Sequence, residues 1–313
     1  MAAMAWQTTG DVTEFLAAAG PYLRRERVRN TVILSVTETM RVNAAASAGK
    51  SSPAAGHPGS ASADGVAGQA ARPLFGWWSD RAGAVAGAFM HTPPFPVLLT
   101  EVTSEAAAEL AAVTMAARPL GGVNAYPEVA EAFADGWRDR GGRDGSRGGR
   151  VEVYRRQRLY RLADLVWPDP APAGTARMAG DADAKLTADW FAAFADEVDD
   201  MSRGEDQSAA ARAKISQAGV MVWEADGQPV SIACNTIPVT GMVRIGPVYT
   251  PPAARGHGYA SAATAALSQR LLEAGAEEVV LFTDLANPVS NSIYQRIGYR
   301  PVEDRVVLAF SAG

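Results

Sequence analysis

The strongest chemical signal in this sequence is the stretch TPPAARGHGYASAA, which covers residues 250–263. It places Gly256 and Gly258 directly before an alanine-rich run with helical character. Glycine adopts backbone conformations that other residues avoid, and it lets a ligand approach the main chain. Because the first N–H groups of a helix have no partner within it, such a start attracts anions, above all phosphates. With the positive charge of Arg255 beside it, the stretch predicts a pyrophosphate-binding loop.

Two common phosphate-binding motifs fit this loop poorly. A P-loop needs Gly-Lys-Ser/Thr at the helix start, whereas residues 258–260 are Gly-Tyr-Ala and contain no lysine. A dinucleotide-binding fingerprint needs a third glycine, and Ser261 stands at that position. Glu277 and Glu278 lie at the distance expected for its acidic residue, so this second interpretation is weakened but stays open.

A third pattern matches better. Residues 255–260, Arg-Gly-His-Gly-Tyr-Ala, fit the R/Q-x-x-G-x-G/A signature of the GNAT superfamily of acyl-CoA-dependent N-acyltransferases. Upstream, VYTPPAARG resembles the strand exit of that family. Downstream, TDLANPVSNSIYQRIGYRPV resembles its second motif, in which an Asn, a helix and a Tyr precede the last strand. The resemblance is strong over about residues 219–310 and extends over 175–313.

The resemblance implies a role for each matching residue, with acetyl-CoA as the cofactor. Main-chain groups of Val248 and Thr250 would contact the pantetheine arm, and the Val248 N–H would polarise the thioester carbonyl. Tyr294 matches the tyrosine that protonates the departing thiolate. The remaining cofactor contacts would be the side chains of Asn287 and Asn291 and the loop amides of Arg255, Gly256, His257, Gly258, Tyr259 and Ala260.

Several of these residues also have purely structural interpretations. Tyr294 lies at helical spacing from Ile297 and would suit a core. Asn287 precedes a proline and would suit a helix cap. His257, between two glycines, is expected to be an exposed loop residue rather than a base. Cys234 lies in a strand pattern and is expected in the core, which disfavours an acyl-cysteine mechanism.

The sequence does not identify the general base. Glu224, Asp284 and Glu303 all lie near strand positions that could face a cleft. For any one of them, a surface position without a catalytic role is the more common arrangement. Proton transfer through water would also serve, because an attacking amine loses its proton late in the reaction.

Bulk properties bound the class of protein. The 313 residues fit two domains, and the net charge of −5 argues against a nucleic-acid binder held by a positive field. One cysteine and three scattered histidines exclude a cysteine-based zinc site, and we expect no metal. The N-terminus lacks the basic region of a secretory signal, and no apolar run is long enough to span a membrane. These features predict a cytoplasmic protein.

Both halves of the chain show the same predicted order of elements, which indicates an internal duplication. The predicted fold class is α/β (an α+β mixed sheet), with two tandem GNAT-like domains, each a mixed, mostly antiparallel sheet flanked by helices. The predicted domains are 1–166 and 175–313, joined by the proline-rich linker 167–174. The low-complexity segment 44–71, with His57, is predicted to be a flexible loop.

The predicted elements follow hydrophobic periodicity and turn signals. In the first half we expect helices at 11–19, 21–42, 104–119 and 127–140 and strands at 74–80, 83–92, 96–102, 121–126 and 151–162. In the second half we expect helices at 181–200, 208–219, 259–274 and 287–298 and strands at 175–180, 220–226, 229–239, 242–252, 277–284 and 299–310. Pro21 is assigned to a first helical turn, Ser104 to a helix cap, and Asp226-Gly227 to a hairpin turn.

The first half lacks the features that make the second half a candidate enzyme. Its comparable strand exit, PFPVLLTEVTSEAAAELAAV, has no glycine pair and no arginine. Glu101 and Glu105 place negative charge where a pyrophosphate would lie. The helix at 127–140 lacks the Asn and Tyr of the second half. We therefore expect a degenerate acyltransferase-like domain that shapes the acceptor site, stabilises its neighbour or forms a homodimer.

Nine arginines gather between Arg138 and Arg161 and raise the question of a nucleic-acid surface. Acidic residues are interspersed among them, and the whole chain is acidic. A solvated loop followed by an alternating strand explains the pattern, so we expect no nucleic-acid partner.

These inferences lead to one function and one alternative. The predicted enzyme is an acetyl-CoA-dependent N-acetyltransferase that acts on an amine of a small molecule or peptide by direct attack on the thioester. The alternative is a non-catalytic CoA-binding or sensor module. The sequence does not identify the acceptor, because the loops that would select it at about 200–208 and 236–243 carry no diagnostic residues.

Overall fold

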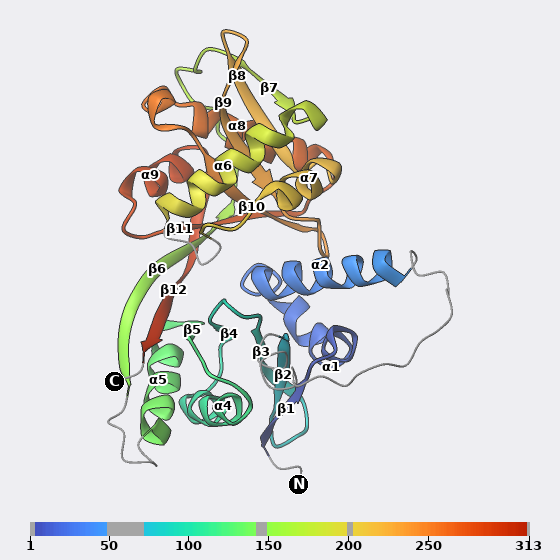
Figure 1. Ribbon diagram of the computed structural model, residues 1–313, viewed down its shortest axis with the longest axis vertical. Coiled ribbons are helices and arrows are strands. Elements are labelled where there is room, and N and C mark those ends of the chain that lie inside the picture. Colours follow the sequence, from blue (N-terminus) through green and yellow to red (C-terminus); the bar gives the residue numbers. More distant parts are fainter. Residues whose placement is uncertain (1–3, 49–71, 142–148, 199–202, 312–313) are drawn as a thin grey trace, which may run out of the picture. The chain divides into compact units, whose positions relative to one another are not determined.

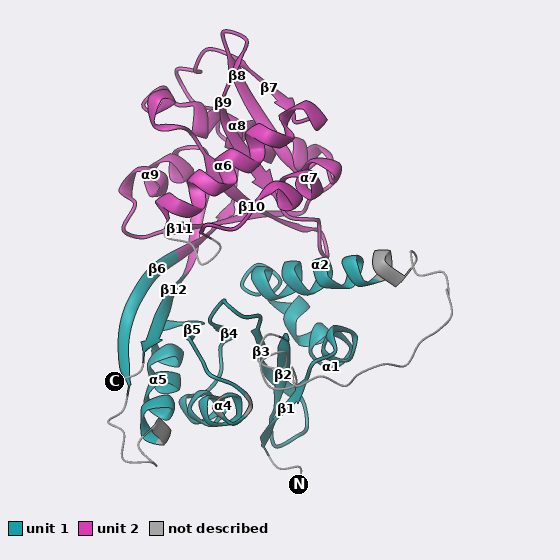
Figure 2. Cartoon of the chain, in the orientation of Figure 1, with its two compact units in different colours: residues 1–157, 304–313 teal, residues 158–303 magenta. Residues whose placement is uncertain are grey.

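The computed structural model describes residues 4–48, 72–141, 149–198 and 203–311. Within this part the chain forms two compact units, coloured separately in Figure 2. Unit 1 consists of residues 1–157 and 304–313, and unit 2 of residues 158–303. The predicted linker at 167–174 lies within unit 2. The division into duplicated domains at 1–166 and 175–313 stays a prediction.

Unit 1 contains an antiparallel strand set followed by a parallel pair (Figure 1). Its strands lie in the order β1-β2-β3-β4-β5-β12, and β4 pairs with β5 in parallel. The elements that begin in it are β1 (Ala5–Thr9), α1 (Val12–Arg25), α2 (Thr31–Ala48), β2 (Leu74–Ser79), β3 (Val85–His91), β4 (Val97–Leu99), α4 (Ser104–Ala117), β5 (Gly122–Ala125), α5 (Pro127–Gly141) and β6 (Arg150–Leu162).

Unit 2 repeats this arrangement. Its strands lie in the order β7-β8-β9-β10-β11-β6, and β10 pairs with β11 in parallel. The elements that begin in it are β7 (Thr175–Met178), the 3₁₀ turn η1 (Asp181–Asp183), α6 (Ala184–Glu197), α7 (Ser208–Ser216), β8 (Val220–Ala225), β9 (Gln228–Asn235), β10 (Met242–Tyr249), the 3₁₀ turn η2 (Pro252–Ala254), α8 (Tyr259–Glu273), β11 (Glu278–Asp284), α9 (Pro288–Arg296) and β12 (Tyr299–Ser311).

The duplication predicted from the element order is confirmed. Each half runs strand, two helices, three strands, helix, strand, helix, strand. The last strand of each half is shared, because β6 starts in unit 1 and ends in unit 2, and β12 does the reverse. The predicted fold class, with tandem mixed and mostly antiparallel sheets flanked by helices, is therefore correct.

Alternation along the strands places helices on both faces of the unit 2 sheet. Met221 and Trp223 of β8 belong to the core that packs on α8, whereas Val220 and Val222 belong to the core under α6 and α7. Side chains of a strand point alternately to its two faces. The sheet is thus covered on each side, and Cys234 lies in the second core as expected.

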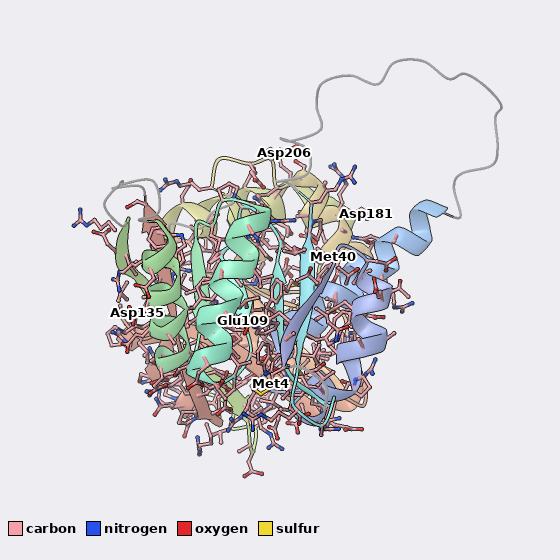
Figure 3. All side chains as sticks on the ribbon, turned by 90° about the horizontal axis from the view of Figure 1, so that it is seen from below. Met4, Met40, Glu109, Asp135, Asp181 and Asp206 are labelled. Atoms are coloured by element: carbon pink, nitrogen blue, oxygen red, sulfur yellow. The ribbon has the colours of Figure 1, made fainter. Side chains whose placement is uncertain are left out.

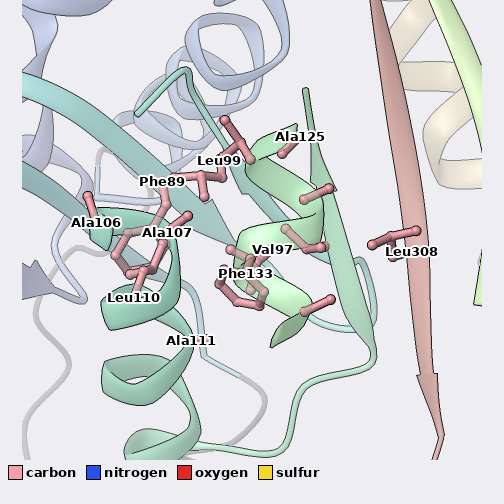
Figure 4. Packing of buried hydrophobic residues seen from close by; sticks show 14 of the residues in the cluster. Phe89, Val97, Leu99, Ala106, Ala107, Leu110, Ala111, Ala125, Phe133 and Leu308 are labelled. Atoms are coloured by element: carbon pink, nitrogen blue, oxygen red, sulfur yellow. The ribbon is translucent and has the colours of Figure 1, made fainter. Parts of the chain in front are cut away.

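The core of unit 1 lies between its sheet and the paired helices α4 and α5 (Figure 4). Phe133 of α5 is fully buried, whereas Asp135, two residues on, is exposed. Figure 3 labels Asp135 on α5 and Glu109 on α4, both on exposed positions of their helices. Each helix thus buries one face against the core and exposes the other.

Some local predictions were wrong. Pro21 lies inside α1, and the break between α1 and α2 falls at residues 26–30 instead. The strand β1 was missed, because five residues without turn signals give little periodicity. Thr103, not Ser104, caps α4. Residues 44–48 of the predicted loop belong to α2, while 49–71 with His57 lie outside the described residues.

Candidate functional site

The two parallel strands of unit 2, β10 and β11, diverge halfway along their length. The β10–β11 register runs from Met242↔Glu278 to Ile245↔Leu281 and ends there, although β11 continues to Asp284. On its other edge β10 shifts register against β9 between Ile245 and Val248. The shift falls on Gly246-Pro247, where proline offers no N–H to a ladder. The divergence opens main-chain groups of β10 beside the end of β11.

The glycine-rich loop follows directly after this divergence. Gly256 and Gly258 both have φ of +82°, a left-handed conformation that side chains other than glycine adopt at a cost. Gly258 is the N-cap of α8, and no side chain caps that helix start. The first-turn N–H groups of α8 therefore face the loop without a side-chain acceptor, which is the arrangement expected of an anion site.

The Arg255 side chain forms an ion pair with Glu197, whereas the sequence analysis assigned its positive charge to a bound pyrophosphate. Its Nη2 lies 2.6 Å from both carboxylate oxygens of Glu197, at the end of α6, and its Nε donates to the Thr250 carbonyl at 2.9 Å. The guanidinium also lies 6.0 Å from the ring centroid of Tyr249. Much of its charge is compensated by Glu197, so the side chain fixes the path of the loop.

The other loop side chains leave the main chain accessible. His257 is exposed, and its ring stacks on Tyr259 at a centroid distance of 5.4 Å. Tyr259 and Ala260 are half-buried in the first turn of α8. Nothing lies within 4 Å of a Cβ built on Gly256. The glycine at 256 is thus required by backbone conformation rather than by local crowding.

Asn287 and Asn291 tie α9 to the end of β11. The Asn287 Oδ1 accepts from the Ser290 N–H at 3.0 Å, so Asn287 is the helix cap that its position before a proline allowed. The Asn291 Nδ2 donates to the carbonyls of Asp284, at 2.8 Å, and Asn287, at 2.7 Å. The Asn291 Oδ1 accepts from the hydroxyl of Tyr160 at 3.0 Å. Both asparagines therefore position α9.

Tyr294 of α9 points into the core and is buried there. It is 9% exposed and meets Tyr299 edge to face at 6.1 Å between ring centroids. Burial raises the pKa of Tyr294 to about 12. The phenol is therefore protonated at neutral pH, which is the form that can donate a proton. The core position expected from its spacing and a role as an acid are compatible.

Two of the three acidic candidates, Glu224 and Asp284, are already engaged in local contacts. Glu224 forms an ion pair with Arg177 at 3.0 Å, and Asp284 Oδ1 accepts from the Ala286 N–H at 2.8 Å. Burial raises the pKa of the Cys234 thiol to about 12, so a thiolate nucleophile is disfavoured there. Among the described residues no cluster of His, Cys, Asp and Glu suits a metal. The described helices include none with the length and apolar character to cross a membrane.

The equivalent position in unit 1 is closed. The β4–β5 register ends at Leu98↔Asn124, but the guanidinium of Arg305 bridges the strand ends there. Its Nη2 donates to the carbonyls of Leu99, at 2.6 Å, and Asn124, at 3.2 Å, and its Nε donates to Asn124 Oδ1. The start of α4 is also occupied, because the Thr103 side chain accepts from the Ala106 N–H. Both features contrast with the open strand gap and uncapped helix of unit 2.

Arg305 should be a large contributor to the stability of unit 1. The residue is 5% exposed, and Arg305→Leu would remove this donor from the buried carbonyl of Leu99 and from the part-buried carbonyl of Asn124. We expect the free energy of unfolding to fall by about 3 kcal/mol. Urea unfolding followed by circular dichroism measures this, with the exposed Arg150→Leu as a control that changes little. Equal midpoints for the two variants would contradict the bridging role.

Comparison with known protein families shows which family this part of the chain resembles. Residues 184–299 match the acetyltransferase (GNAT) family. The chain carries a GNAT acetyltransferase domain. Its match begins at α6 and ends at the first residue of β12, so it spans the strand gap, the loop and α9. No curated protein matches the sequence significantly.

Solved structures share the fold over more of the chain. A Drosophila protein covers 99% of this chain and 99% of its own length, with a TM-score of 0.61 and 12% identity. A GCN5-related N-acetyltransferase from Kribbella flavida covers 72% of this chain and 87% of its own, with a TM-score of 0.51 and 21% identity. One from Sphaerobacter thermophilus covers 76% and 81%, with a TM-score of 0.52 and 15% identity. At these identities the likeness establishes the fold.

Sequence reasoning missed three residues that organise the GNAT domain. Glu197 anchors Arg255, while Tyr160 and Gln295 fix α9 against β6, with the Gln295 Nε2 donating to the Tyr160 hydroxyl at 3.0 Å. Glu197 lies 58 residues before its partner, and Tyr160 lies 135 residues before Gln295. No local sequence pattern predicts contacts between residues so far apart in the chain. Glu197 and Gln295 lie at exposed positions, so neither differs in the sequence from an ordinary surface residue.

Proposed function

We propose that this chain is an acetyl-CoA-dependent N-acetyltransferase whose site lies in unit 2. The observation that carries the proposal is the divergence of β10 from β11 after Ile245 and Leu281, directly before an uncapped, glycine-started helix. The main-chain groups of β10 in the strand gap would bind an extended arm of the ligand. The N–H groups at the start of α8, directly beside them, would bind its phosphates. Membership of the GNAT acetyltransferase family supports the reaction class.

The residues around this gap suit coenzyme A. The amides of residues 255–260 would hold the pyrophosphate, because the two left-handed glycines leave the main chain uncovered. Main-chain groups of Val248 and the N–H of Thr250 would hold the pantetheine arm, since the β10–β11 pairing ends at Ile245. The Thr250 carbonyl already accepts from Arg255 Nε. Asn287 and Asn291 lie at the start of α9, where they would contact the same arm while holding the helix in place.

Acetyl-CoA, when bound, supplies a thioester carbonyl that an amine can attack. The Val248 N–H would stabilise negative charge on that oxygen, as a preorganised donor that needs no rearrangement. Tyr294 would donate its proton to the sulfur as the bond to the acyl carbon breaks. Its raised pKa keeps that proton in place at neutral pH. The acceptor amine would lose its proton through water, because the local acids are engaged elsewhere.

The proposed acceptor is an amine of a small molecule or peptide, and the proposed compartment is the cytoplasm. The single cysteine is buried and needs no oxidising environment. Unit 1 would serve as a stabilising or acceptor-shaping partner without a cofactor, since Arg305 and Thr103 occupy the corresponding features.

Calorimetric titration with acetyl-CoA tests the proposal. We expect one site per chain, followed by release of free thiol when an amine acceptor is added. Two sites would show that unit 1 also binds the cofactor. The absence of heat at about 1 mM ligand, which corresponds to a binding free energy weaker than about −4 kcal/mol, would reject the acetyltransferase assignment. Binding without turnover across an amine screen would favour a CoA sensor.

A further inference from the structure

The connection between β6 and β7 has to cross the whole of unit 2. In the strand order β7-β8-β9-β10-β11-β6 of this unit, the two strands lie at opposite ends. Residues 163–174, called the crossing segment below, join them and belong to unit 2 throughout. They include the proline-rich stretch that the sequence analysis assigned to a linker. The path of this segment over unit 2 decides what it can contact.

Two indole groups hold the proline-rich part of the crossing segment. Near its beginning, the Trp167 Nε1–H donates to Gln269 Oε1 of α8 at 3.1 Å. Near its end, the Trp223 Nε1–H of β8 donates to the Ala173 carbonyl at 3.0 Å. The stretch between these two hydrogen bonds is therefore fixed at both ends, one on α8 and one on β8.

Between these anchors, Pro172 reaches the start of α8. Its Cβ and Cγ each lie 3.8 Å from the position that a Cβ on Gly258 would take, which is an ordinary van der Waals distance. Gly258 and Gln269 are about 16 Å apart along the helix axis, and the stretch from Trp167 to Pro172 covers about that distance when extended. The crossing segment therefore runs along α8 and arrives at its N-cap glycine.

Pro172 lies on the side of the glycine loop that is away from the strand gap. The gap separates β10 from β11, whereas the neighbouring Ala173 is bonded to β8, and β9 lies between β8 and β10. A ligand with its arm in the gap and its pyrophosphate at the start of α8 extends its remaining end beyond the loop. In coenzyme A that remaining end is the adenosine nucleotide.

The crossing segment is apolar where it meets the loop. Residues 170–173 are Pro-Ala-Pro-Ala and contain no charged or hydrogen-bonding side chain. Proline rings fix the backbone φ, so less conformational freedom is lost when a ligand packs against them. Proline-rich segments pack against aromatic rings in recognition sites. A purine offers such a ring, whereas the phosphates of the same ligand need the N–H donors of the loop.

We propose that Pro172 forms a wall against which the adenine of acetyl-CoA packs. This inference rests on the acetyltransferase function proposed above. It assigns a cofactor contact to a residue outside the family match at 184–299. Three parts of unit 2 would then hold the three parts of the cofactor: the strand gap the pantetheine arm, the loop amides the pyrophosphate, and the crossing segment the adenine.

Calorimetric titration of Pro172→Ala with two ligands tests this wall. The first ligand is acetyl-CoA, and the second is S-acetyl-4′-phosphopantetheine, which keeps the arm and one phosphate but lacks the adenosine. We expect the variant to bind acetyl-CoA about fivefold more weakly than the parent chain, because it loses roughly 40 Å² of apolar contact. Its affinity for the truncated ligand should equal that of the parent chain.

Pro168→Ala is the matched control for this variant. Pro168 belongs to the same segment and is also half-buried, but it follows Trp167 at the anchor far from the loop. Both variants gain similar backbone freedom in the unfolded chain, so their thermal unfolding midpoints should fall by similar amounts. Pro168→Ala should bind both ligands as the parent chain does. Equal weakening of acetyl-CoA binding in the two variants would reveal a general loosening of the segment and overturn the proposal.

The two ligands also separate the other ways in which the proposal can fail. Unchanged acetyl-CoA affinity in Pro172→Ala would exclude the contact with adenine. An equal loss of affinity for both ligands would show that Pro172 shapes the loop and does not touch the adenine. If the parent chain binds neither ligand, the proposed acetyltransferase function fails, and this inference fails with it.

Discussion

Gly258→Trp should abolish acetyl-CoA binding. At φ of +82° a tryptophan is strained, and its side chain would stand at the start of α8 among the amides proposed for the pyrophosphate. The strain costs about 1–3 kcal/mol. We expect calorimetry to detect no binding at about 1 mM ligand, where the parent chain saturates.

A second glycine in the same unit offers a matched control. Gly227, in the β8–β9 turn, has φ of +71° and nothing within 4 Å of a built Cβ. Gly227→Trp should carry a similar backbone strain and lower the unfolding midpoint in the same way. It should leave acetyl-CoA affinity unchanged. Retention of full affinity by Gly258→Trp would remove the loop from the cofactor site.

Tyr294→Phe should lower kcat by about 100-fold or more, because a positioned general acid contributes about that much. The KM for acetyl-CoA should change little, since the hydroxyl is proposed to act on the departing sulfur. Thiol release monitored with a chromogenic disulfide measures both constants. Because the pKa of Tyr294 is about 12, the parent enzyme should show no loss of rate from this group between about pH 6 and 10.

Tyr299→Phe is the control for a structural effect. Tyr299 is fully buried beside Tyr294, and its hydroxyl lies 2.7 Å from Ser268 Oγ of α8. Loss of this hydrogen bond should cost about 1 kcal/mol of stability, with kcat unchanged. If both variants lost activity equally, packing rather than proton donation would explain Tyr294. Unchanged turnover in Tyr294→Phe would point to another acid.

The local features of the GNAT domain could be predicted from the sequence, because each is produced by residues that are neighbours in the chain. Asp226-Gly227 predicted a hairpin, and both residues have positive φ, as a two-residue hairpin turn requires. Gly256 and Gly258 predicted an unusual backbone before a helix, and both are left-handed. Asn287 before a proline allowed a helix cap and forms one. Each of these depends on a few consecutive residues.

Features that join distant segments were beyond the reach of such patterns. The compensation of Arg255 by Glu197 changes that arginine from a free charge into a loop anchor. The bridge from Arg305 to Leu99 joins residues 206 positions apart and closes the strand gap of unit 1. The sharing of β6 and β12 between units follows from where the strands pair, not from where the chain folds back.

The sequence by itself predicted the order of elements apart from β1, the duplication of that order and the family signature at 255–260 and 283–302. These follow from hydrophobic periodicity, turn chemistry and motif spacing, all of which are local properties of the chain. Only the tertiary structure decided which of two similar halves keeps an open strand gap. In unit 2 the gap follows the register shift at Gly246-Pro247, whereas in unit 1 the guanidinium of Arg305 occupies the ends of β4 and β5. The position of Arg305 could not be predicted, because side-chain partners are selected by three-dimensional proximity rather than by distance along the chain.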